Sequence, residues 1–65
     1  MKIGIVGLGL IGGSLAKAYK STPGNYVYGY DINKSVLSFA KLAGAIDEDL
    51  NESNIKGCDC IFIAL

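Results

Sequence analysis

The fold of this chain is decided by the segment Lys2-Ile3-Gly4-Ile5-Val6-Gly7-Leu8-Gly9-Leu10-Ile11-Gly12-Gly13-Ser14. Its first part, Lys2 to Val6, is a short apolar run rich in β-branched residues, which is typical of a parallel strand covered on both faces. Glycines follow, and apolar residues then recur at helical spacing from Leu10 to about Ser21. The segment therefore predicts a strand, a tight glycine turn and a helix.

The glycines of this turn have the spacing GxGxxG, which serves phosphate binding when a strand precedes it and a helix follows. The first glycine permits the tight exit from the strand, the second lets the main chain approach a diphosphate, and the third lets the helix lie close to the sheet. Main-chain amides at the start of the helix lack partners and face the favourable end of the helix dipole. A glycine turn can also serve packing alone. The candidate diphosphate-binding residues are Gly7, Leu8, Gly9, Leu10, Ile11 and Gly12.

A carboxylate, Asp31, ends the next expected strand, Tyr26 to Asp31, about 20 residues after the turn. At that place a carboxylate accepts hydrogen bonds from the ribose hydroxyls of adenosine. The 2′-phosphate of NADP would meet a like charge there, and the only nearby cation is Lys34. We therefore expect Asp31 to bind the ribose and NAD to be the cofactor; an ordinary turn aspartate is the alternative.

The rest of the chain continues to alternate helices and strands. We expect a helix from an N-cap at Asn33 to Ala43, with Gly44 ending it, and a brief edge strand around Ile46. A poorly ordered or single-turn helical link through residues 51–56 precedes the last strand, 58–65, which is apolar enough to be buried on both faces.

This order of elements predicts an α/β fold, namely part of a Rossmann-type doubly wound parallel sheet. The favoured strand order is 3-2-1-4, with the last strand beside the first. If the segment near Ile46 forms no strand, the order becomes 3-2-1, with the last strand as the third.

Composition narrows the classes of protein and partner. With 65 residues the chain forms one domain at most, and its stability should be marginal. Six lysines balance six acidic residues, so neither nucleic acid nor an anionic membrane is expected as partner. Nothing resembles a signal peptide or a membrane span, and we expect a cytoplasmic protein. Cys58 and Cys60 are expected to be buried reduced thiols, and no metal site is expected.

No residue of the chain is assigned a catalytic role. The sequence contains neither histidine nor arginine, so it lacks the usual proton shuttle near neutral pH and the bidentate clamp for a carboxylate. Ser14 lies in the first turn of the expected helix, where a hydroxyl usually bonds back to a nearby carbonyl. The alternating tyrosines Tyr26, Tyr28 and Tyr30 are expected to pack in the core.

Several segments together resemble the amino-terminal part of prephenate dehydrogenases. They are Val6 to Ala16, in which Gly12-Gly13-Ser14 is the most specific element, Gly29 to Asp31, Gly44 to Asp47, and Cys58 to Leu65. The resemblance implies oxidative decarboxylation of prephenate to 4-hydroxyphenylpyruvate in tyrosine biosynthesis, with hydride transfer to NAD. It also implies a homodimer when full length, prephenate or arogenate as the small-molecule substrate, and Ala64 and Leu65 beside the adenosine.

In that family the nucleotide domain is longer, a helical domain follows it, and a catalytic histidine and a substrate-binding arginine lie downstream. We therefore expect residues 1–65 to be the amino-terminal part of an NAD-binding Rossmann domain, truncated and inactive alone. Two alternatives stay open. One is a nucleotide-binding module without catalysis, and the other is an NAD(P)-dependent dehydrogenase of the β-hydroxyacid type.

Overall fold

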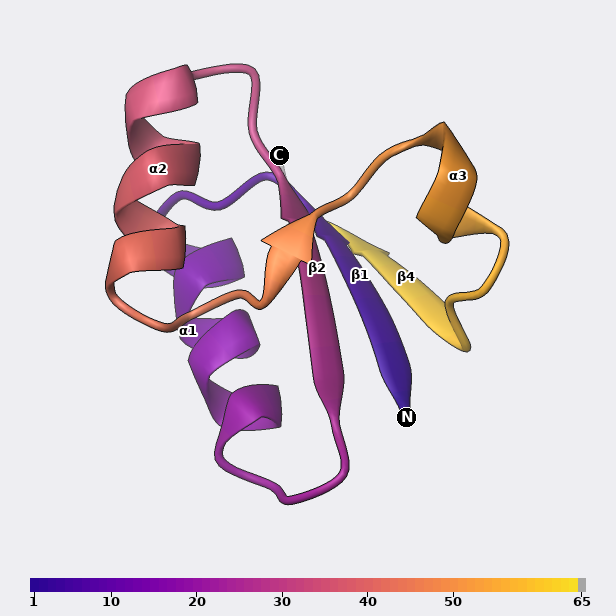
Figure 1. The fold of residues 1–65 in the computed structure, drawn as a ribbon. Helices are drawn as coiled ribbons and strands as arrows, with labels where there is room; N and C mark the ends of the chain where they lie inside the picture. The colour runs from indigo at the N-terminus through magenta and orange to yellow at the C-terminus, as the bar shows by residue number, and fades with distance from the viewer. Residues whose placement is uncertain (65) are drawn as a thin grey trace.

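The computed structural model describes residues 1–64, which form an α/β unit of alternating strands and helices (Figure 1). All strands are parallel, and their order in the sheet is β3-β2-β1-β4. The expected α/β class and the favoured strand order are confirmed. The elements are β1 (Lys2–Val6), α1 (Leu10–Lys20), β2 (Tyr26–Tyr30), α2 (Lys34–Leu42), β3 (Glu48–Asp49), α3 (Glu52–Ile55) and β4 (Cys60–Ile63).

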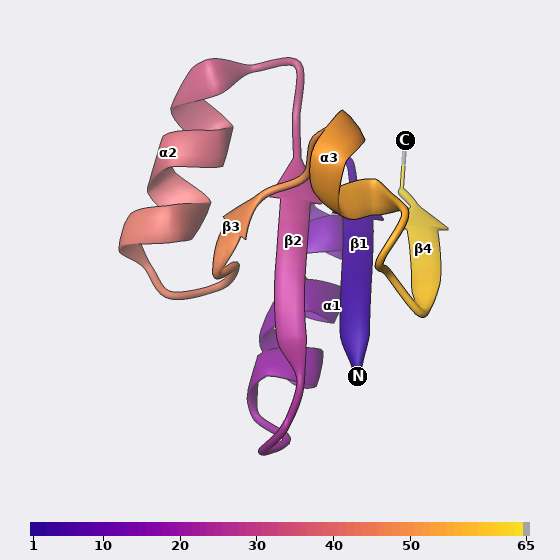
Figure 2. The same ribbon diagram turned by 45° about the vertical axis from the view of Figure 1, so that its right-hand side comes forward.

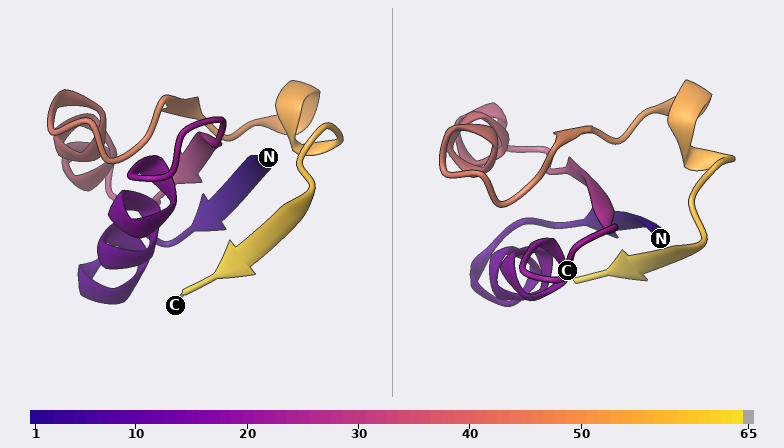
Figure 3. Two further views of the ribbon diagram at one scale, coloured as in Figure 1. Left: turned by 90° about the horizontal axis from the view of Figure 1, so that it is seen from below. Right: turned by 60° about the horizontal axis from the view of Figure 1, so that its bottom comes forward.

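The helices lie on the two faces of the sheet. Figure 2 shows α1 behind the sheet and α3 in front of it, and Figure 3 shows α1 and α2 on the side away from α3. The central strand β1 places Ile3 opposite both Val27 and Cys60, and Ile5 opposite both Gly29 and Phe62. These rows form the sheet side of a core that α1 and α2 cover.

Small residues bring the helices close to the sheet. The buried residues of α1 are Gly12 and Ala16, and the buried residue of α2 is Ala40. Ile11 and Phe39 belong to the apolar positions that recur at helical spacing in α1 and α2, a pattern that predicts inward packing, but these residues are 76% and 71% exposed. Small side chains make the closest approach of each helix to the strands, while Leu15 and Tyr19 of α1 and Val36 and Leu37 of α2 pack, partly buried, against the same core.

The ends of α2 agree with the sequence. The Asn33 side chain accepts hydrogen bonds from the main-chain N–H groups of Ser35 and Val36, so it caps the helix as predicted. Gly44 follows the helix with a φ of 75°, a conformation that favours glycine. The predicted single-turn link is α3, which the Asn51 side chain caps.

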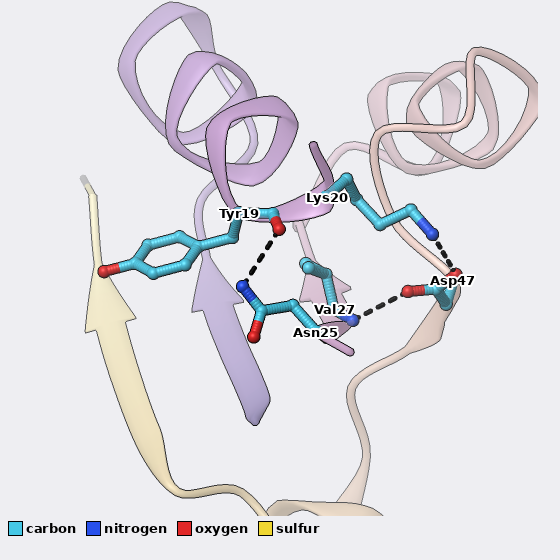
Figure 4. Close-up of polar contacts among 5 residues, drawn as sticks. All are labelled: Tyr19, Lys20, Asn25, Val27 and Asp47. Atoms are coloured by element: carbon cyan, nitrogen blue, oxygen red, sulfur yellow. Dashed lines mark hydrogen bonds and ion pairs between the residues drawn. The ribbon is translucent and has the colours of Figure 1, made fainter. Parts of the chain in front are cut away.

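Asp47 joins α1, β2 and the segment that leads to β3 (Figure 4). Its Oδ1 accepts a hydrogen bond from Lys20 Nζ at 2.6 Å, and its Oδ2 accepts one from Val27 N at 2.7 Å. Partial burial raises the pKa of Asp47, but the hydrogen bond and charge of Lys20 and the N–H of Val27 outweigh this effect and lower it. The carboxylate therefore links the amino-terminal end of β2 to the carboxyl-terminal end of α1.

The brief edge strand expected around Ile46 is present as Glu48–Asp49, whereas Ile46 itself is buried against Gly29, where a Cβ would lie 2.8 Å from the Ile46 side chain. The expectation that the last strand is buried on both faces is wrong. In β4, Cys60 and Phe62 pack against the core, but Ile61 is half-exposed and Ile63 is 68% exposed. The face of β4 away from α1 has no helix over its carboxyl end in the described part of the chain.

The tyrosines and cysteines also differ from expectation. All three tyrosines of β2 lie on the sheet face away from α1 and α2, where Tyr28 is buried but Tyr26 and Tyr30 are exposed. Cys58 precedes β4 and lies beside Gly4, whereas Cys60 packs against the core on the other face. Both thiols are free and partly buried, and burial raises the pKa of Cys58. Within residues 1–64, no helix has the length and apolar character needed to cross a membrane.

Candidate functional site

A crevice of about 410 Å³ lies at the carboxyl ends of β1, β2 and β4. Open α/β sheets bind ligands at this edge, where neighbouring helices leave in opposite directions. In this sheet α1 leaves β1 on one face, and the chain that reaches β4 arrives from the other face. The residues that line the crevice are Val6, Gly7, Gly9, Tyr30, Asp31, Ile32 and Ala64.

The glycines of the turn differ in the space around them. Gly7 has a φ of 94°, and a Cβ there would overlap the carbonyl oxygen of Ala64. A Cβ on Gly12 would overlap the carbonyl oxygen of Gly7, so α1 can start this close to the turn only with glycine. Gly9 is different, because a Cβ there would meet nothing within 4 Å. The main chain at Gly9 therefore borders open space on the crevice side.

Asp31 lies directly beside the turn. Its Oδ2 accepts a hydrogen bond from Leu8 N at 2.7 Å, and its Oδ1 accepts one from Asn33 N at 2.9 Å. The bond from Asn33 and then the bond from Leu8 lower the pKa of Asp31 below its ordinary value. The side chain is consequently a carboxylate at neutral pH, and each oxygen keeps capacity for a further donor.

The start of α1 adjoins the crevice at Gly9, which lines it, whereas Leu10 lines a separate hollow of about 250 Å³ between α1 and α2. Gly9 is the N-cap, and no side chain caps the helix; its first turn carries no acidic residue. The first N–H groups, at Leu10 and Ile11, have no acceptor further back within the helix. Ser14 Oγ donates to the Leu10 carbonyl oxygen at 2.9 Å, the backward bond that was predicted for this serine. An anion placed before Leu10 would meet both the free amides and the helix dipole.

The end of β4 closes the other side of the crevice. Ala64 N donates a hydrogen bond to the Val6 carbonyl oxygen at 2.8 Å, so Ala64 continues the pairing of β4 with β1 beyond the strand. Figure 3 shows the ends of these two strands side by side, next to the loop that enters α1. Leu65, the last predicted adenosine neighbour, lies outside the described residues.

The crevice carries one charged side chain, Asp31, among the residues that line it. Lys34 lies on the other side of Asp31, where it lines an adjoining hollow of about 440 Å³ together with Lys41. Lys41 is paired there with Asp49 at 3.1 Å. A phosphate inside the crevice itself would therefore meet main-chain amides and a carboxylate, but no lining cation.

A larger hollow of about 670 Å³ lies at the opposite, amino-terminal end of the sheet. Met1, Tyr26, Glu48 and Asp59 are among the residues that line it. No described helix of eight residues or more begins there. The smaller crevice has the amides, the glycine turn and the sheet edge suited to an anionic ligand, so we regard it as the candidate site.

The structure brings the predicted residues Gly7, Gly9, Asp31 and Ala64 together around this crevice, with Leu8 bound to Asp31 behind it. Leu10 and Ile11 lie beyond the lining, on the exposed first turn of α1. Tyr30 and Ile32, which flank Asp31 and line the crevice, were not predicted as site residues, and neither was the N–H of Asn33. Their position next to Asp31 in the sequence is the signal that could have identified them. Comparisons with protein-family models, with curated proteins and with solved structures found no match for this chain.

Proposed function

We propose that this chain binds the adenosine diphosphate half of NAD, as the amino-terminal part of a Rossmann-type nucleotide-binding domain. The observation that carries the proposal is the contact of Asp31 with the glycine turn, at 2.7 Å from Leu8 N, on the edge of a crevice lined by Gly7 and Gly9. Packing alone explains a glycine turn. It does not explain why an ionised carboxylate, an uncapped helix start and open space at Gly9 meet at one sheet edge.

In this proposal the diphosphate lies against the amides at the start of α1, where Gly9 lets it approach the main chain. The adenosine ribose hydroxyls donate to Asp31, whose oxygens each already accept one main-chain N–H. Ile32 and Ala64 form the apolar borders of the crevice beside the adenosine. The chain's contribution is thus binding and orientation of the cofactor.

NAD is favoured over NADP on electrostatic grounds. A 2′-phosphate next to Asp31 would bring two negative charges together without a lining cation to offset them. Lys34 lies across Asp31 in the adjoining hollow, and Lys41 is paired with Asp49. We expect NADP to bind at least about tenfold more weakly than NAD, which corresponds to about 1.4 kcal/mol.

The resemblance to prephenate dehydrogenases supports the enzyme class. We infer that the chain serves a cytoplasmic NAD-dependent enzyme that decarboxylates prephenate or arogenate oxidatively in tyrosine biosynthesis and acts as a homodimer. NAD accepts the hydride in that chemistry. The 65 residues contain no histidine and no arginine, so they supply the cofactor half and not the groups that handle the substrate. This same absence favours the second candidate, a nucleotide-binding module without turnover.

Calorimetry with NAD, ADP-ribose and NADP tests the proposal. Equal affinity for NAD and ADP-ribose, with weaker NADP binding, supports binding of the adenosine half; tighter binding of NADP overturns the assignment of Asp31. Formation of NADH from prephenate by an enzyme containing this segment would separate the dehydrogenase from the binding module. The 65-residue chain alone should form no NADH.

A further inference from the structure

The Asp31 carboxylate also binds the main chain of the glycine turn. Two consecutive amides of the glycine turn are bound to two consecutive residues at the end of β2: Gly7 N donates to the Tyr30 carbonyl oxygen, and Leu8 N donates to Asp31 Oδ2, each at 2.7 Å. The first bond is one that main-chain groups make in any parallel pairing. The second depends on the Asp31 side chain, because the strand pairing has ended.

This attachment holds one peptide unit of the turn. Peptide units are planar, so the bond from the N–H of Leu8 to Asp31 fixes the orientation of the unit that joins Gly7 to Leu8, directly before Gly9, the N-cap of α1. Gly9 has no side chain, and nothing lies within 4 Å of where its Cβ would be. The Leu8 side chain is buried in the core, and among the described residues the bond from Leu8 N to Asp31 is the one hydrogen bond between the main chain of residues 7–9 and a side chain.

We propose that Asp31 is a positioning residue for the diphosphate-binding amides, and that the ribose and diphosphate halves of the site are coupled through Leu8. The proposal rests on the proposed function. It differs from a ribose contact alone, because it makes Asp31 necessary for binding a ligand that has no ribose.

Charge repulsion and positioning by Asp31 predict opposite changes in diphosphate affinity when the carboxylate is removed. The negative charge of Asp31 repels a diphosphate, so its removal would strengthen diphosphate binding if the charge were all that mattered. If Asp31 holds the turn, its removal weakens the binding of the same ligand. In Asp31→Asn the amide group presents an NH₂ to one of two main-chain donors, Leu8 N or Asn33 N, so that at least one bond is lost.

The experiment titrates inorganic diphosphate into the 65-residue chain and follows the main-chain amide resonances of Gly9 and Leu10. Asp47→Asn is the matched control, since Asp47 also accepts a main-chain N–H of β2, from Val27, but at the far end of the strand. We expect Asp31→Asn to bind diphosphate about fivefold or more weakly than wild type, and Asp47→Asn to bind it as wild type does.

Hydrogen exchange gives a readout that needs no ligand. The Leu8 amide should exchange about tenfold faster in Asp31→Asn, relative to the change in global stability, and not in Asp47→Asn. If wild type binds diphosphate and Asp31→Asn binds it equally or more tightly, the positioning role is wrong while the proposed function stands. If diphosphate shifts no amide of the turn in wild type, the proposed function itself fails, and the coupling with it.

Discussion

Two adjacent glycines of α1 should respond in opposite ways to the same substitution. A Cβ on Gly12 would overlap the carbonyl oxygen of Gly7 and lie 2.8 Å from the Gly7 carbonyl carbon. A Cβ on Gly13 would lie 3.6 Å from the Leu8 carbonyl oxygen, an ordinary contact. The atoms that a Gly12→Ala methyl meets belong to the main chain, and Gly7 is tied to β2 through its bond to Tyr30.

The magnitudes follow from these contacts. Alanine in place of glycine inside a helix contributes about 0.5–1 kcal/mol, so Gly13→Ala should stabilise the chain by about that amount. Gly12→Ala has the same helix preference, but forcing a methyl group against fixed main chain costs about 1–3 kcal/mol or more. Because the helix preference is common to both, the two variants should differ by the steric cost, about 1–3 kcal/mol or more in free energy of unfolding, which is about 4–24 °C in Tm for a domain of this size.

Thermal and urea unfolding followed by circular dichroism measure the difference. Gly13→Ala should melt above wild type and Gly12→Ala below it; loss of the folded signal in Gly12→Ala agrees with the expected direction. Equal stability of the two variants would show that α1 does not start against the carbonyl of Gly7, and the described geometry of the turn would be wrong.

Three further predictions concern the scaffold. Asp47→Asn should cost about 1–2 kcal/mol at neutral pH because it breaks the bonds to Lys20 and Val27. Since the pKa of folded Asp47 is lowered, this stability is present above the unfolded pKa and is lost as the pH falls through the folded pKa. Urea unfolding between about pH 5 and 2 should therefore show a free energy of unfolding that depends less steeply on pH in the variant than in wild type. Asn33→Ala should cost about 1 kcal/mol through loss of the α2 cap, and an unchanged urea midpoint would contradict that cap. Ile63→Thr should change stability by less than about 0.5 kcal/mol because Ile63 is exposed, whereas Ile3→Ala should cost about 2–5 kcal/mol; a comparable loss in both would mean that β4 is covered on both faces.

Local sequence patterns were sufficient to predict the elements whose ends are marked by residues within the same segment. The bounds of β1, the cap at Asn33 and the end at Gly44 follow from residues within each segment, and the structure agrees. The strand order followed from the apolar character of the last strand and the weak segment before it. These features depend on neighbours in the sequence or on the pattern of whole segments.

Features that depend on distant contacts were less accessible. The sequence could not show that Ile11 and Phe39 would face outward, because the helix stripe is selected by the small residues that approach the sheet. It placed Asp31 near a ribose, but not in contact with Leu8, which is 23 residues away. The pairing of Lys20 with Asp47 likewise joins segments whose proximity only the fold determines.

The most direct test of the central claim is a titration of the isotope-labelled chain with ADP-ribose, followed through its main-chain amide resonances. Binding at the carboxyl edge of the sheet predicts the largest shifts at Leu8, Gly9, Leu10 and Ile32, around the crevice, with Lys2 and Tyr26 at the far end little changed. Shifts concentrated at that far end, or no saturable shifts at all, would contradict the claim that the glycine turn and Asp31 form a nucleotide site.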